Sequence, residues 1–140
     1  MCESTIGTRH HAEVEIGRTV SLPFGEASRM IEQALQREGF GVLTRIDVKE
    51  TLEKKLGVAL APYLILGACN PQLARRALEL EPRMGVLLPC NIVVRELAPG
   101  KTRVEAVNPE AMADLFPGTE LETVAHEARR GLLRALDDAQ

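Results

Sequence analysis

Hydrophobic and polar residues alternate in two stretches of the first third of the chain, as is typical of strands that bury one face. Between these stretches, apolar residues recur at helical spacing from Phe24, and Gly39 ends the pattern, which predicts a helix over residues 24–38. The inward positions of the two flanking strands are expected to be Val14, Ile16, Val20 and Leu22, then Phe40, Val42, Ile46 and Val48.

A short helix is expected directly after the second strand. Asp47 and Glu50 have the spacing of a capping box, in which side chains bond the free amides of a helix start. Leu52 and Leu56 are the apolar positions of this helix and are expected to point inward, and Gly57 ends it.

The middle of the chain contains an uninterrupted apolar segment, residues 63–68. Such a segment is typical of a central strand that is covered on both faces. Asn70 and Pro71 follow it, and this pair favours a helix start, with Asn70 as the N-cap and Pro71 in the first turn. The helix is expected to stop at Glu81-Pro82.

The last third of the chain predicts a hairpin and two helices. Residues 91–97 and 103–107 are the expected hairpin strands, joined by a turn that contains Pro99 and Gly100. Asn108-Pro109 repeats the cap-plus-proline pattern before a short helix, and Thr119 and Glu122 are expected to cap the final helix, to about residue 137.

This order of elements predicts an α+β fold, with strands and helices in two layers. We expect a mainly antiparallel sheet of about five strands with helices packed on it, a two-layer sandwich similar to split βαβ folds. The length of 140 residues corresponds to one domain. We expect that domain over residues 13–140, after a flexible N-terminal arm over residues 1–12.

Composition narrows the classes of function. The formal net charge is -3, and aromatic residues make up 3% of the chain. The sequence therefore lacks both the basic patch and the stacking residues that are typical of a nucleic-acid-binding protein. No apolar run approaches a membrane span, and the first residues lack the pattern of a signal peptide. Three cysteines are a small and odd number for a scaffold held by disulfides, so we expect a protein of the reducing cytoplasm.

The candidate chemistry lies in two segments that each break from apolar to polar at a Cys-Asn pair. The first runs from Gly67 through Cys69 and Asn70 to Pro71, and the second is Pro89-Cys90-Asn91. Cys69 is expected immediately before a helix N-terminus, where the helix dipole lowers the pKa of a thiol and free amides can hold an anion. If the two strands are neighbours, Cys69 and Cys90 approach each other.

Three hypotheses follow for these segments. The leading one is a small-ligand or anion site formed by Gly67, Cys69, Asn70, Pro71, Cys90 and Asn91. The second is a thiol-dependent enzyme or redox protein with Cys69 as the nucleophile and Cys90 as the resolving thiol. The third is a purely structural or interaction role, because free cysteine is often just a small buried residue.

No cofactor or resident metal is expected. The chain has no phosphate-binding loop, no nucleophile elbow, no Cys-x-x-Cys and no zinc-protease motif. A closed zinc site needs four ligands, and these segments supply only Cys69 and Cys90, with no histidine nearby in the sequence.

Three motifs in order resemble the bacterial and archaeal family called domain of unknown function 302: residues 39–49, residues 66–71 and residues 87–91. The resemblance covers roughly residues 14–110. It implies a compact α+β domain that tends to dimerise and implies no established activity. It associates a histidine with position 75, where this chain has Arg75, which argues against a cysteine–histidine nucleophile pair beside Cys69.

We also expect a homodimer. Short strands leave sheet edges to protect, and such edges are natural self-association surfaces. The hairpin from Asn91 to Val107 is the edge that the sequence favours for this contact, because Arg95, Arg103 and Glu105 guard it only in part.

Overall fold

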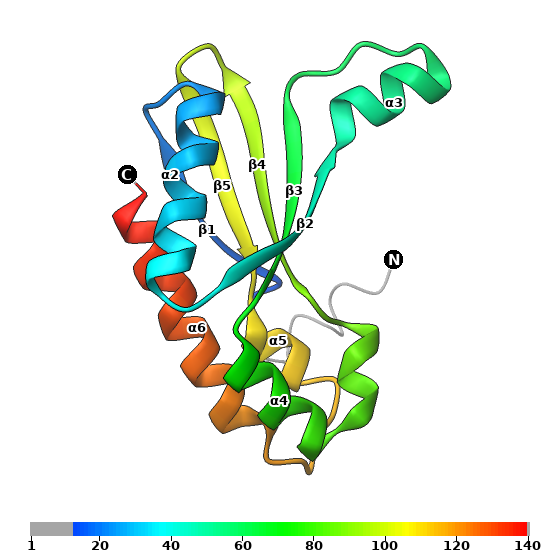
Figure 1. Ribbon diagram of the computed structural model, residues 1–140, viewed down its shortest axis with the longest axis vertical. Coiled ribbons are helices and arrows are strands. Elements are labelled where there is room, and N and C mark those ends of the chain that lie inside the picture. The colour runs from blue at the N-terminus through cyan, green and yellow to red at the C-terminus, as the bar shows by residue number, and fades with distance from the viewer. Residues whose placement is uncertain (1–12, 140) are drawn as a thin grey trace, which may run out of the picture.

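A computed structural model describes residues 13–139 as one antiparallel sheet with helices on one face and at both ends (Figure 1). The expected arm over residues 1–12 lies outside the described residues. The sheet has the order β1-β5-β4-β3-β2, and every neighbouring pair is antiparallel. Its strands are β1 Glu15–Val20, β2 Gly41–Asp47, β3 Tyr63–Cys69, β4 Cys90–Ala98 and β5 Lys101–Val107.

The α+β prediction is confirmed, including its likeness to a split βαβ unit. Four successive antiparallel pairings make β1 and β2 run in the same direction at opposite edges of the sheet. Helix α2, Phe24–Arg37, joins them, and the other three strands are inserted between the two. The helix predicted over residues 24–38 therefore exists and makes this crossover.

Two helices cover the sheet and build the main core. Helix α2 and the final helix α6, Leu121–Asp138, contact each other and pack on the same face of the sheet. The core between these layers includes fully buried Ile31, Leu66, Ile92 and Leu132. Aliphatic residues at helical and alternate-strand spacing meet here, and this burial is the main stabilising term of the fold.

A second, smaller core lies at one end of the sheet. Helix α4, Pro71–Leu80, packs on α6, and the single-turn elements η1, Pro82–Val86, and α5, Pro109–Ala113, complete this end (Figure 1). Its buried members are small or flexible side chains: Ala77, Met84, Met112, Ala113, Leu121, Val124 and Ala125.

The sheet face opposite the helices is open, so the prediction that residues 63–68 are covered on both faces is wrong. Within β3, Leu64, Leu66 and Ala68 are buried, whereas Tyr63 and Ile65 on the alternate face are only half-buried. On the same open face, the Glu105 carboxylate accepts hydrogen bonds from Arg95 at 2.7 Å and Arg103 at 3.0 Å. In this chain the uninterrupted apolar run forms β3, the strand that pairs with the edge strand β2.

The predicted hairpin forms, but it does not offer a sheet edge. Strand β4 pairs with β3 and β5, and β5 pairs with β4 and β1, so both hairpin strands lie inside the sheet. The edge strands are β1 and β2. The prediction that the hairpin offers a free sheet edge is therefore wrong, because strands distant in sequence pair with both sides of the hairpin.

Three local details also differ from expectation. Asp47 caps helix α3, Val48–Leu56, and its side chain accepts a hydrogen bond from the Glu50 amide. Leu56 was expected to point inward, but it is exposed, and the helix buries no residue. The start of α6 is not a capping box, because Thr119 bonds the Phe116 carbonyl instead. The turn η1 was not predicted.

No helix within residues 13–139 is both long and apolar enough to cross a membrane.

Candidate functional site

The first Cys-Asn segment lies where β3 ends and α4 begins. Cys69 is the last residue of β3 and is half-buried. Asn70 is the N-cap of α4, and its side-chain oxygen accepts a hydrogen bond from the Leu73 amide at 3.2 Å. Pro71 occupies the first turn, as the sequence predicts, and its side chain is exposed. The segment therefore holds the helix start firmly beside the strand end.

The second segment lies directly beside the first one. A cis peptide bond joins Leu88 to Pro89, and β4 begins at Cys90. Cys90 pairs with Ala68 across the β3–β4 ladder, so it lies next to the end of β3 that carries Cys69. Asn91 is exposed on the open face of the sheet.

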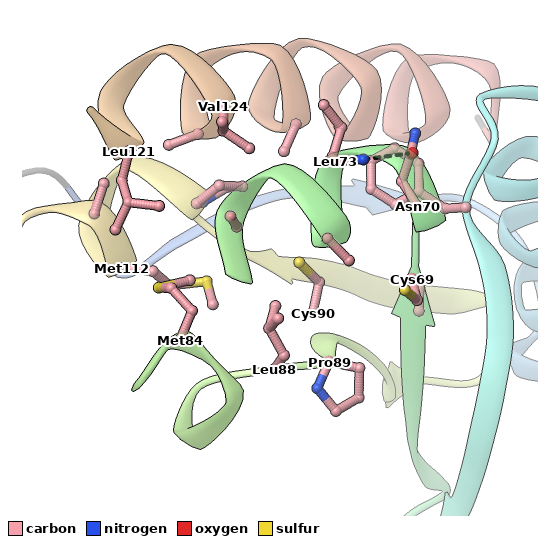
Figure 2. A pocket seen from close by; sticks show the side chains of 18 residues that line it. Cys69, Asn70, Leu73, Met84, Leu88, Pro89, Cys90, Met112, Leu121 and Val124 are labelled. Carbon is pink, nitrogen blue, oxygen red and sulfur yellow. Dashed lines mark hydrogen bonds between the residues drawn. The ribbon is translucent and has the colours of Figure 1, made fainter. Parts of the chain in front are cut away.

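An apolar cavity of about 60 Å³ lies between these segments and the helical end of the molecule (Figure 2). Cys69, Asn70, Pro89 and Cys90 line it from the sheet side. The other walls are mostly apolar and come from α4, η1, the turn before β4, α5 and α6: Leu73, Ala74, Ala77, Met84, Leu88, Pro109, Met112, Ala113, Leu121, Val124, Ala125 and Ala128. Phe40, which directly precedes β2, and Ala68 of β3 complete the lining. One water needs only about 10–15 Å³ of such space. The cavity can therefore hold several heavy atoms.

Gly67 serves packing instead of lining the cavity. A Cβ atom at this position would overlap with Thr44 Oγ1 and lie 2.9 Å from Pro89 Cγ. Glycine is therefore required so that a β2 side chain and the proline of the second segment can both cover the β3 backbone. Of the six predicted ligand-binding residues, Cys69, Asn70 and Cys90 border the cavity, whereas Gly67, Pro71 and Asn91 do not.

The charges near the helix start do not converge on the cavity. The Arg75 guanidinium pairs with Glu79 at 3.3 Å, and the Arg76 guanidinium pairs with Glu127 at 3.1 Å. Pro71 has no amide hydrogen, and Asn70 already bonds the amide of Leu73. At most one amide of the first turn is left for an anion, so the arrangement favours an uncharged ligand.

Burial keeps the Cys90 thiol neutral. Its burial, together with the nearby Cys69, raises its pKa from 9.0 to about 11. A raised pKa is opposite to what a reactive thiolate needs. Within residues 13–139, no group of three His, Cys, Asp or Glu side chains could hold a metal ion.

The comparisons with known proteins agree on one family. The model of the family "Domain of unknown function DUF302" matches residues 16–139. The chain belongs to this family. No protein with a curated description matches it. The chain is similar to the crystal structure of an uncharacterized conserved DUF302 protein from Bacillus stearothermophilus, with a TM-score of 0.84 and 32% sequence identity. The match covers 92% of this chain and 100% of that chain.

Part of the cavity lining of this DUF302 domain was not predicted from the sequence as part of a site. Met84, Met112 and Leu121 belong to this part, and they come from η1, α5 and the start of α6. None of these three residues belongs to a motif. Their one shared signal is that Met84 and Met112 are large apolar residues in short segments that are otherwise polar or small. That signal indicates burial without indicating a shared partner.

Proposed function

We propose that this DUF302 domain is a small binding module that takes an uncharged, mainly apolar ligand into the cavity at the α4 end of the sheet. The observation that carries the proposal is the cavity itself, because an apolar space of about 60 Å³, partly open to solvent, lies among buried side chains. Protein interiors are packed as densely as organic crystals, with few voids larger than a water molecule. An apolar void of this size is a ready site for an apolar group.

The walls also suit a ligand of variable shape. Met84 and Met112 are each 6% exposed and face the cavity. Methionine is unbranched and flexible, and it adapts readily to different apolar partners. Asn70 and Cys69 lie at the polar side of the space. The ligand therefore inserts an apolar end among the methionines and keeps any polar end near the start of α4.

Methyl NMR on the full chain tests this proposal directly. With 13C-labelled methionine methyls, we expect xenon or benzene to shift the Met84 and Met112 signals. Met30 packs against the main core and not on the cavity, so its signal is the internal control. Unshifted Met84 and Met112 signals at saturating xenon and benzene would contradict the proposal.

A cavity-filling variant gives the second arm. Ala125 lines the space, and Ala125→Leu places additional carbon atoms in it. We expect this variant to lose the xenon and benzene shifts at the two methionines. Ala98→Leu makes the same change at an exposed position outside the cavity and is expected to keep them.

The thiol-dependent alternative rests on a different observation, which is that Cys69 and Cys90 both border the same cavity. It needs Cys69 to act as the nucleophile, because Cys90 is neutral and buried. A thiol-dependent activity that disappears with Cys69→Ser would favour it, and loss of turnover with Cys90→Ala would assign the resolving role to Cys90. A chain that neither binds apolar probes nor reacts at Cys69 would have the structural role.

Cytoplasmic location belongs to the same proposal. A small chain with three cysteines, two of them free within residues 13–139, suits a reducing compartment. Fractionation of the native host followed by immunodetection checks this, and an extracellular signal would contradict it.

A further inference from the structure

Sulfur-bearing side chains are concentrated around the cavity. Residues 13–139 contain five sulfur-bearing side chains. Four of them line the cavity, namely Cys69, Cys90, Met84 and Met112, and Met30 alone packs elsewhere. The four come from β3, β4, η1 and α5, so only the tertiary fold brings them together.

Three of these sulfurs belong to well-buried side chains. Met84 and Met112 are each 6% exposed, and Cys90 is 9% exposed. Figure 2 shows the two methionine side chains meeting at one side of the space, with the Cys90 thiol facing the same space from β4. Cys69 lies at the rim and is half-buried.

We propose that Cys90, Met84 and Met112 hold a soft monovalent cation, Cu(I), inside the cavity. Thiolate and thioether sulfurs are the ligands that Cu(I) prefers. One Cys90 thiolate balances the single positive charge of Cu(I), and the thioethers of Met84 and Met112 add none. The completed site is neutral, as a desolvated apolar cavity requires.

The binding step balances without an oxidant. The S–H bond of Cys90 breaks, its proton leaves to solvent, and a sulfur–copper bond forms. Copper stays in the +1 state throughout. No carboxylate, imidazole or guanidinium lines the cavity, so the site lacks the charged oxygen ligands that hard divalent cations such as Mg²⁺ and Ca²⁺ prefer. The side-chain oxygen of Asn70 already accepts a hydrogen bond from the Leu73 amide.

This inference goes beyond the apolar-ligand proposal and does not depend on it. The two occupants use the same space, and their experiments separate them. Xenon and benzene report on the space alone, whereas Cu(I) binding requires the sulfur atoms. Either result can fail while the other stands.

Anaerobic titration of the full chain against a chromogenic Cu(I) chelator tests the site. We expect one Cu(I) per chain. Cys90→Ala is expected to weaken binding at least about 100-fold, since removing even an outer-shell partner of a metal site costs 10–100-fold. Met84→Leu and Met112→Leu are each expected to weaken it about tenfold. Leucine nearly conserves the volume of methionine, so these variants keep the fold.

Matched variants decide whether the site is the one assigned. Met30→Leu removes a thioether outside the cavity and is expected to leave the affinity unchanged. Unaltered affinity in the Met84→Leu/Met112→Leu double variant, with far-ultraviolet circular dichroism unchanged, would overturn the proposal. So would loss of binding with Cys2→Ser or Cys69→Ser while Cys90→Ala still binds.

Discussion

Cys90 illustrates at the residue scale how burial decides the chemistry of a side chain. As a residue in a Cys-Asn pair it is a candidate resolving thiol, and in the fold it faces an apolar cavity with a pKa raised to about 11 by burial and the nearby Cys69. The neutral thiol is the stable form there, because a thiolate without a counter-ion loses its solvation.

The raised pKa of Cys90 predicts a loss of stability at alkaline pH. The unfolded thiol ionises near pH 9, whereas the folded one stays protonated until about pH 11. Above pH 9 the unfolded state binds fewer protons, so the stability that this thiol contributes falls as the pH rises towards 11. We expect the free energy of unfolding of wild type, relative to Cys90→Ala, to fall by roughly 2 kcal/mol over this window. Urea denaturation at a series of pH values measures it, and a flat difference contradicts it.

Gly67 gives a second prediction at the residue scale. Gly67→Ala places a methyl group against Thr44 and Pro89, so we expect a destabilisation of about 1–3 kcal/mol, the usual range for overpacking. Thermal denaturation measures this change. Gly85→Ala is the control, because a Cβ at Gly85 meets no atom within 4 Å. Equal melting temperatures for Gly67→Ala and wild type would show that Gly67 is not needed for close packing.

At the scale of elements, helix starts are the features that local sequence specifies best. Asp47, Asn70 and Asn108 each accept a hydrogen bond from an amide of the following helix. Asn108 also donates from its side chain to the Glu13 carbonyl at 2.8 Å, which ties the start of α5 to the segment before β1. Caps depend on residues two or three positions apart, so sequence alone can identify them.

The Asn70 cap is expected to contribute measurably to stability. Asn70→Ala removes the acceptor for the Leu73 amide at the first turn of α4, and the expected cost is about 1 kcal/mol. Asn70→Asp keeps an acceptor at the same position and is the matched control, with little change expected. Chemical denaturation of the three proteins decides this. If Asn70→Ala and Asn70→Asp behave alike, the hydrogen bond is not the stabilising contact.

At the scale of the whole molecule, α3 and its surroundings form an apolar arm. The helix buries no residue and extends from the β2–β3 end of the sheet (Figure 1). Five of the eleven large exposed apolar residues within residues 13–139 lie on β2, α3 and the following loop: Leu43, Ile46, Leu56, Val58 and Leu60. Exposed apolar surface on a small domain favours an interaction site.

We propose that this arm, and not the β4–β5 hairpin, is the contact of a homodimer. Light scattering is expected to report about twice the chain mass of 15.3 kDa. Leu56→Glu, at a side chain that is 68% exposed, is expected to give the monomer without unfolding it. Val86 lies on η1 and is 84% exposed. The variant Val86→Glu is therefore the control, and we expect it to remain a dimer. A monomeric wild type would remove the proposal.

The sequence by itself determined the elements of this protein and their class. Periodicity and caps depend on neighbours in the chain, and they predicted α2, α4, α6, the hairpin and an antiparallel α+β sheet. They left open whether the two Cys-Asn segments meet, which the pairing of Ala68 with Cys90 across β3 and β4 decides. What only the tertiary structure decided is set by contacts between distant residues. These contacts place β4 and β5 inside the sheet, leave one face of β3 open, and bring Met84 and Met112 to the cavity beside Cys90. No local pattern encodes such contacts, because the free energy of burying a side chain depends on which surfaces the complete fold brings against it.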